Sequence, residues 1–597
     1  MNRRFPLGLI GLVMILTGCD YQNKKPPILP SGIVDGPLPT APGRPASSTA
    51  STIDSPQSTT LTNEIDPEIQ RRRDVILANV INLMKTASIN PGGQNFAIAT
   101  DNLNDLFDQG TQPSDYEYNE ESKKFLLRKI ALLYNQDPEP IVKALSSPKF
   151  TIKDARHLED CMLYHNVATR VAGEGDDLSK VRRIFDWVVR NVELIPAESL
   201  AAPNMRQAQA RPADVLVRGM ATEYGGYWSE RGWLFMSLCR QIGVDVGILT
   251  FMPRISPLAS PEVANRPPVA WVTAAAIDGK LYLFEQRLGI EIPGPDGTGV
   301  ATLDEALTNP IVLGRLDLPG SFLYGTTGEE IAASTTRIGV LLDSSPGYFA
   351  PRMRLLQGQL RGEYRTILFR DALEQARNFA QALGPRVGLI NLWELPTLVE
   401  QSLFTKPEFV AATQMSLQFF RSELPLLLAR TAHLRGNLEE AIEKYGTLRF
   451  AQGAVMNDAD KTPITPEVQT ALDVYSTFFL AQCQMDRGKI DEAEFLFRML
   501  VKMTPEPGPG RYYFYMLRWS ALSNLGRICE KKGDYAGAIK FYSENIQANE
   551  RHGNMLKARE LIWNDPFREP APPLAPAPSP PPPPASESKP AVKPAAG

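Results

Sequence analysis

The sequence predicts an α+β fold class, with a helical N-terminal region, a central α+β unit and an all-α C-terminal repeat region. Three observations support this prediction. Apolar residues within 177–192 recur at intervals of three and four, which is typical of an amphipathic helix. Asp278-Gly279 joins the apolar segments 269–277 and 280–285 in the pattern of a two-residue β-hairpin turn. Beyond residue 405, a glycine, an alanine and an aromatic residue recur at fixed spacing, which indicates helical repeats.

The first 19 residues have the pattern of an export signal that ends at a lipid-attachment site. Arg3 and Arg4 precede an apolar run over 7–16, which is too short to span a bilayer, because a transmembrane helix needs about 20 apolar residues. Leu16-Thr17-Gly18-Cys19 follows and resembles the lipobox of bacterial lipoproteins. The resemblance implies removal of residues 1–18 and lipidation of Cys19, which would anchor the chain on the periplasmic or extracellular face of an envelope membrane. An ordinary signal peptide with a chance cysteine is the alternative.

The charge and cysteine content argue against two function classes. The chain has 63 basic and 67 acidic residues and a net charge of −4, whereas nucleic-acid binding needs a dense basic face, so we expect no nucleic-acid partner. No CxxC motif or Cys/His cluster is present, and we expect neither a metal nor another cofactor. The cysteines beyond residue 19 are predicted to be buried free thiols, with disulfides as the alternative outside the cytoplasm: Cys161, Cys239, Cys483 and Cys529.

Proline-rich segments flank the folded part of the chain. Residues 19–64 lack apolar periodicity, and we expect a disordered tether there, because too little apolar area is available to offset chain entropy. Proline makes up 13 of the 32 residues from 566 to 597, so residues 564–597 are predicted to form an extended polyproline II tail. This tail is either a passive spacer or a ligand for an aromatic groove or for cell-wall material.

Between these ends, the order of elements starts with helices. Residues 65–174 are predicted to be helical, because Ile76, Val80 and Met84 recur with the spacing of one buried helix face. Residues 311–404 are predicted to be a mixed α/β connector of unknown type, with a strand-like run over 338–342 and no motif.

The unit between them, residues 175–310, is predicted to combine helices with strands. Asp177 can cap its first helix, and a second helix runs from Ser229, another possible cap, to Gly243, where a left-handed stop is expected. A buried strand over 246–251 follows, before the hairpin described above.

Segments of this unit resemble the transglutaminase-like, papain-like fold: Ile184-Phe185-Asp186-Trp187-Val188, the run from Leu234 to Gly243, and Ala270-Trp271-Val272. Members of that family carry a cysteine that opens the central helix, a histidine directly before Ala-Trp, and an aspartate on the next strand. The corresponding positions here hold Trp228, Val269 and Glu285. Amide attack needs a thiolate made nucleophilic by an imidazole that a carboxylate orients, so the departures imply a degenerate domain with no catalytic residues.

Aromatic residues near these positions, Tyr224, Tyr227 and Trp271, are candidates to line the former cleft beside Trp228. They would either bind a peptide or plug the groove.

The rival hypothesis is an enzyme with displaced catalytic residues, namely a cysteine- or serine-dependent amide hydrolase or acyl transferase. Cys239 or Ser229 would be its nucleophile, and His157 or His165 its base. We expect instead that Cys239 packs in the core, that Ser229 caps a helix, and that both histidines are structural.

The C-terminal repeats, over residues 405–563, have a glycine, an alanine five residues later and an aromatic residue nine residues later: Gly436, Ala441 and Tyr445; Gly488, Ala493 and Phe497; Gly533, Ala538 and Tyr542. This pattern resembles the tetratricopeptide repeat, in which glycine lets the first helix turn, alanine lets two helices approach, and the aromatic ring fills the gap to the next repeat. Successive glycines lie 52 and 45 residues apart, not the usual spacing of about 34, so inserts over 456–466 and 505–511 are expected to interrupt the stack.

Such repeats bind extended protein segments on a concave surface. The residues that the resemblance assigns to a peptide-binding concave face are Arg430, Tyr475, Phe478, Gln482, Arg527 and Lys531. A partly basic groove suits an acidic or C-terminal peptide, and solvated helix residues without a ligand are the alternative. The sequence therefore predicts a non-catalytic, membrane-anchored lipoprotein that binds proteins or peptides, with the enzyme and a purely structural envelope spacer as rivals.

Overall fold

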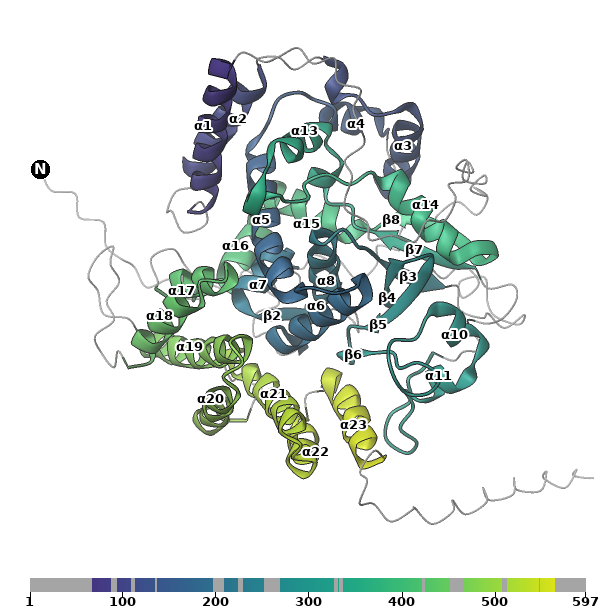
Figure 1. Cartoon of the computed structure of the whole chain (residues 1–597), viewed down its shortest axis with the longest axis vertical. Coiled ribbons are helices and arrows are strands. Elements are labelled where there is room, and N and C mark those ends of the chain that lie inside the picture. Colours follow the sequence, from purple (N-terminus) through teal and green to yellow (C-terminus); the bar gives the residue numbers. More distant parts are fainter. Residues whose placement is uncertain are drawn as a thin grey trace, which may run out of the picture.

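The computed structural model describes residues 67–86, 94–108, 113–134, 137–196, 209–223, 229–251, 269–326, 331, 337–420, 425–450, 465–506, 513–546 and 548–563. The fold class is α+β, as the sequence predicts, with a mixed sheet among helices and a C-terminal arc of helices (Figure 1). The predicted signal peptide, tether and tail lie outside these residues. No helix within the described ranges is long and apolar enough to cross a membrane.

The N-terminal region is helical, as predicted, and its longest helix, α5, reaches the centre of the molecule (Figure 1). Its helices are α1 (Pro67–Met84), α2 (Gln94–Asp108), α3 (Glu120–Tyr134), α4 (Glu139–Leu145) and α5 (Ile152–Ala172), and α6 (Asp177–Asn191) follows as the first helix of the predicted unit 175–310. The predicted cap of α6 is off by one residue. The carboxylate that accepts from the backbone N–H of Ser179, at 2.7 Å, belongs to Asp176 rather than to Asp177.

The central sheet has six strands in the order β6-β5-β4-β3-β7-β8. Its strands are β3 (Asp245–Phe251), β4 (Val269–Ile277), β5 (Lys280–Glu285), β6 (Ile290–Glu291), β7 (Ile338–Leu342) and β8 (Val387–Leu392). The predicted hairpin is confirmed: Asp278 and Gly279 have φ of 50° and 73°, and β4 pairs antiparallel with β5. Gly243, with φ of 81°, ends the preceding helix as expected.

The segment predicted as a connector, residues 311–404, is instead part of this sheet. Its strand β7 pairs antiparallel with β3, and β8 pairs parallel with β7. The same segment supplies α14 (Ala372–Leu383), which covers one face of the sheet, while α8 (Ser229–Gln241) and α6 contact strands of the same sheet. Residues 311–404 also contain α13 (Pro351–Gln359) and α15 (Glu394–Thr405). The short helices α10 (Leu303–Thr308) and α11 (Pro310–Gly314) lie in sequence between β6 and β7.

One hydrophobic core unites the three predicted N-terminal units, because buried residues from Val80 to Leu392 belong to a single cluster. The boundaries predicted at residues 174 and 310 therefore do not divide the core. A small parallel pair of strands, β1 (Glu193–Pro196) and β2 (Met220–Glu223), lies outside the main sheet and is separated in sequence by α7 (Pro212–Arg218).

The C-terminal helices form an arc around the lower edge of this unit (Figure 1). They are α16 (Pro407–Ser416), α17 (Pro425–Leu434), α18 (Leu438–Phe450), α19 (Pro466–Asp486), α20 (Ile490–Met503), α21 (Leu517–Lys532), α22 (Tyr535–Glu544) and α23 (Ala548–Trp563). Their core is a second cluster, which also takes in Ile195 of β1 and Met220 of β2. The repeats are thus packed onto the α/β unit through apolar contacts.

Candidate functional site

The predicted repeat chemistry is present in the structure. Gly436, Gly488 and Gly533 have φ of 86°, 75° and 76°, a backbone region that glycine adopts without strain. The alanine and the aromatic residue of each copy are fully buried. In the third copy, a Cβ placed on Gly526 of α21 would lie 2.5 Å from the ring of Tyr542 on α22. The absence of a side chain at Gly526 therefore lets these two helices meet.

The inner face of the repeats is occupied by the α/β unit of the same chain. Arg430 of α17 is fully buried, and its Nε and Nη2 donate to the backbone oxygen of Leu216 at 3.1 and 2.7 Å. Leu216 lies in the last turn of α7, where helix carbonyls lack partners within the helix. The guanidinium also lies over the ring of Phe479, 3.9 Å from its centroid. Arg430 therefore caps α7 and is unavailable to a ligand.

Two further helices of the arc, α19 and α21, cap α6 in the same way. Gln482 of α19 and Asn524 of α21 both donate to the backbone oxygen of Arg190, at 2.6 and 3.1 Å. Arg190 lies in the last turn of α6. Polar side chains of the inner face thus satisfy helix carbonyls of the α/β unit.

A buried ionic cluster around Asp486, the last residue of α19, completes the joint, by which we mean the contact between the repeats and the α/β unit. Its carboxylate accepts from Arg170 of α5 at 2.6 Å and from Trp187 of α6 at 3.3 Å, and Arg190 lies 3.9 Å away. Burial alone would raise the pKa of Asp486, but His433 and the neighbouring arginines hold it below the usual range. Asp486 is therefore a buried anion that links two helices of the α/β unit to the repeats.

His433 of α17 is neutral in this cluster, because burial lowers its pKa to about 4. Arg430 Nη1 lies 2.9 Å from Nδ1 of His433, so Nδ1 is the acceptor and the ring proton is on Nε2. Nε2 faces Asp486 at 3.7 Å.

The predicted peptide-binding face is wrong for four of its six residues. Arg430, Tyr475, Phe478 and Gln482 are fully buried, because the α/β unit and the neighbouring helices cover them. Arg527 is half-buried and Lys531 is exposed. An extended peptide cannot occupy the covered part of this surface unless the repeats first separate from the rest of the chain.

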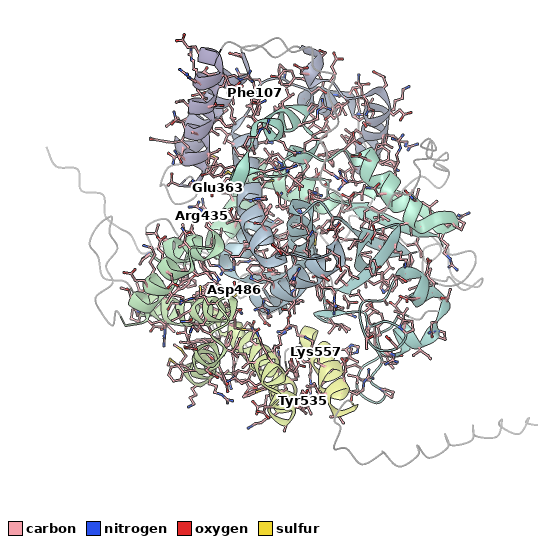
Figure 2. All side chains as sticks on the ribbon, viewed as in Figure 1. Phe107, Glu363, Arg435, Asp486, Tyr535 and Lys557 are labelled. Carbon is pink, nitrogen blue, oxygen red and sulfur yellow. The ribbon has the colours of Figure 1, made fainter. Side chains whose placement is uncertain are left out.

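An open cleft lies at the border of the covered joint, between α6, the turn after β6, the C-terminal end of α19 and α23. Its volume is about 1120 Å³. Figure 2 labels two of its wall residues, Asp486 and Lys557, along the border between the repeats and the α/β unit. Seven cationic and five acidic side chains line it: Arg170, Arg182, Arg183, Arg190, Arg315, Lys557 and Arg559; Asp186, Glu291, Asp296, Asp486 and Glu560. We call this feature the joint cleft.

Comparison with known proteins identifies the class of one of the repeats. Residues 521–550 match the tetratricopeptide repeat family. This match spans most of α21, all of α22 and the start of α23, so it confirms the third copy of the predicted pattern. No curated protein and no solved structure matches the chain.

Two of the three positions that the sequence resemblance assigned to a degenerate triad, Val269 and Glu285, lie in the described residues. Val269, at the start of β4, is 38% exposed, and Glu285, at the end of β5, is buried. Glu285 accepts from the hydroxyl of Tyr324 at 2.7 Å, and Trp271 Nε1 donates to the same hydroxyl at 3.0 Å. Burial raises the pKa of Glu285. Trp271 therefore belongs to a buried hydrogen-bond chain, which fits a ring that plugs the groove better than one that lines a peptide-binding cleft.

Several predicted residues lie outside the described part of the chain. They are Cys19, the aromatic residues Tyr224, Tyr227 and Trp228, and residues 456–464 of the predicted first insert. The backbone of Ser229 is described, but its side chain is not.

Every cysteine in the described residues is buried and free, as predicted. Cys239 is fully buried, and burial raises its thiol pKa well above the usual value. His157 lies beside Cys161, with Nε2 3.6 Å from the sulfur. Cys161 is also fully buried, and burial raises its pKa while lowering that of His157. Both groups are therefore neutral, and the pair lacks the thiolate that nucleophilic attack needs.

Within the described residues, no group of three His, Cys, Asp or Glu side chains is placed to hold a metal ion.

Asp486 and Lys557 are the site residues that sequence reasoning missed. Asp486 is the last residue of α19, where nothing in the local pattern distinguishes it from a solvated acid, and Lys557 lies in α23, which has no recognisable motif. The one sequence signal at the joint is the set of arginines in α6, Arg182, Arg183 and Arg190, on a helix already predicted to be amphipathic.

Proposed function

We propose that this protein is a non-catalytic scaffold, held at a membrane of the cell envelope by a lipid on Cys19, that binds protein partners at the joint cleft. The observation that carries the proposal is the docking of the repeats onto the α/β unit. The inner face is used within the chain, and the joint cleft at its edge has walls from both parts.

The tetratricopeptide match supports a role in protein binding, because stacked helix pairs of this class present extended surfaces to other proteins. The docking supports a rigid platform. Its buried hydrogen bonds and the Asp486 cluster fix the position of α19 against α5 and α6, so the walls of the joint cleft are held in place before a partner arrives.

The proposal that the protein is not a catalyst is supported by the departures from the transglutaminase-like pattern. Val269 stands where that family has histidine. Glu285 stands where the family has aspartate, and its carboxylate is buried against Tyr324. The described thiols are buried and neutral. A cysteine- or serine-dependent hydrolase or acyl transferase is the rival function, and it would require a reactive Ser229 or Cys239.

The lipobox resemblance supports the anchor. Residues 19–64 would then lift the folded part away from the bilayer, and the proline-rich tail would extend from α23 near the joint cleft, where it acts as a spacer or contacts wall material.

Chemical crosslinking of native membranes, followed by mass spectrometry, tests the proposed function. We expect partner peptides joined to residues near the joint cleft, such as Lys180, more often than to Lys124 on α3. A thiol- or serine-directed activity probe on the purified full chain is the complementary measurement. Stoichiometric labelling of Cys239 or Ser229, lost on mutation, would establish the enzyme instead, and an absence of crosslinked partners would contradict the scaffold.

A further inference from the structure

The joint cleft carries more positive charge than its own acidic residues neutralise. Three of the acids are paired with arginines of the same walls: Glu291 with Arg182 at 2.9 Å, Asp186 with Arg190 at 2.8 Å, and Asp486 with Arg170 at 2.6 Å. Asp296 accepts from the backbone N–H and hydroxyl of Thr298, both at 2.9 Å. The other four cationic residues of the walls outnumber the other two acids, Asp296 and Glu560.

Hydrogen bonds in the described part of the chain do not neutralise two of these cations. Arg183 and Arg315 donate to backbone carbonyl oxygens, which carry no net charge. Lys557 makes no ion pair within the described part of the chain, and its ammonium group lies 5.9 Å from the centroid of the Tyr542 ring. The cleft walls therefore have a net charge of about +2, although the whole chain has a net charge of −4.

Unused donors line the same space. Nε of Arg315, and Nε and Nη2 of Arg170, are buried without a hydrogen-bond partner in the described part of the chain. Unpaired buried N–H groups are costly, and an arginine presents them in a planar fork that matches a carboxylate. A ligand carboxylate would satisfy them.

The dimensions favour a chain segment over a compact metabolite. The cleft, at about 1120 Å³, exceeds the range of about 300–1,000 Å³ that is usual for small-molecule pockets. Its wall also carries paired acids among the cations, which would oppose a continuous phosphate backbone but leave room for separated carboxylates.

We infer that the joint cleft binds an acidic polypeptide segment, with carboxylates of that segment placed against Arg183, Arg315 and Lys557. This inference rests on the proposed scaffold function and specifies the chemistry of its partner.

The position of Lys557 also makes the interaction sensitive to pH. Burial and the neighbouring charge of Arg527 lower the pKa of Lys557 to about 8. Other charged groups near its ammonium are Glu530 of α21, Asp186 of α6 and Glu550 of α23. A bound carboxylate favours the charged ammonium, so affinity is expected to fall as pH rises through about 8.

The test is fluorescence anisotropy with the full chain and a fluorescein-labelled peptide of alternating Glu and Ser. We expect binding that weakens as salt rises from about 50 to about 500 mM, because screening reduces exposed charge interactions. The matching Gln-Ser peptide should bind at least about tenfold more weakly. Arg183→Glu with Lys557→Glu should weaken binding of the acidic peptide by about tenfold or more. Lys124→Glu on α3 makes the same kind of charge change away from the cleft and should leave binding unchanged.

Thermal unfolding followed by circular dichroism checks that each variant folds, and Lys557→Gln, which only removes charge, replaces the charge reversal if it does not. Equal binding of the Gln-Ser peptide, equal loss in Lys124→Glu, or equally tight binding of single-stranded DNA would overturn the inference. The proposed scaffold function has its own test, because crosslinking that recovers no partner would reject it. Retained crosslinks without binding of the acidic peptide would reject only the ligand class.

Discussion

Asp486 accepts a hydrogen bond from Arg170 at 2.6 Å, although 316 residues separate the two in sequence. The pair joins the last turn of α19 to α5, and with Arg190, Trp187 and His433 it forms the polar centre of the joint between the repeats and the α/β unit. A repeat array that normally presents its inner face to a ligand here uses part of that face to close on its own chain.

Asp486→Asn is expected to destabilise the protein by about 3 kcal/mol, because it leaves buried cations without their counter-charge. The pKa of Asp486 is held below its usual 3.8, so the difference is full above that pH and shrinks in stronger acid. Urea unfolding measures it. Glu439→Gln is the matched control, because Glu439 pairs with Arg487 at 2.6 Å but is 79% exposed, and its loss should cost at most about 1 kcal/mol. Equal effects of the two substitutions would contradict a buried cluster.

Gly526→Ala is expected to destabilise the third repeat by about 1–3 kcal/mol, because the new methyl group would lie 2.5 Å from the ring of Tyr542. Gly446→Ala supplies the control within α18. Its new methyl group meets nothing within 4 Å, so the higher helix propensity of alanine should stabilise the protein by about 0.5–1 kcal/mol. Thermal unfolding of the two variants should shift in opposite directions. A shift in the same direction would argue against close packing at Gly526.

Glu193→Gln is expected to stabilise the protein near neutral pH. Glu193 is buried with neither carboxylate oxygen bonded in the described part of the chain, and burial and then the charge of Glu550 raise its pKa. An acid with a raised folded-state pKa contributes stability below its unfolded value, which is lost as pH rises. The variant should therefore gain at least about 1 kcal/mol at pH 8 and lose this advantage near pH 4. An unchanged difference across that range would exclude titration of Glu193 as the cause.

The described thiols should resist iodoacetamide in the native protein. Cys161, Cys239, Cys483 and Cys529 are buried, and burial raises the pKa of each, so little thiolate forms near pH 7. Mass spectrometry should detect modification of these residues only after denaturant is added. Fast native labelling of any one of them would favour the enzyme hypothesis.

Cys19→Ser should release the protein from the membrane fraction, if lipidation at this residue is the anchor. Labelling of cells with a palmitate analogue should mark the wild-type protein and leave the variant unmarked. A variant that stays in the membrane fraction without the label would require another means of attachment.

Local sequence patterns predicted much of the fold. The Asp278-Gly279 hairpin and the Gly243 stop depend on backbone geometry that a few adjacent residues determine, and the glycine, alanine and aromatic pattern depends on contacts between consecutive helices. These features need no knowledge of distant contacts.

The candidate site was not predictable in the same way. The partner of Arg430 is a backbone oxygen 214 residues away, and nothing in the local sequence distinguishes a buried cap from a solvated cation. The strand at 338–342 was visible, but its place beside β3 follows only from the three-dimensional pairing.

Site-specific photo-crosslinking in intact cells distinguishes partner binding at the joint cleft from binding at the inner face of the repeats. A photoreactive amino acid replaces Arg182 in the joint cleft, Gln482 on the covered inner face, or Lys124 on α3, in separate experiments. We expect a crosslinked partner at position 182 and none at 482 or 124. A partner captured at 482 while position 182 stays silent would show that proteins bind the inner face after all, and would contradict the closed joint.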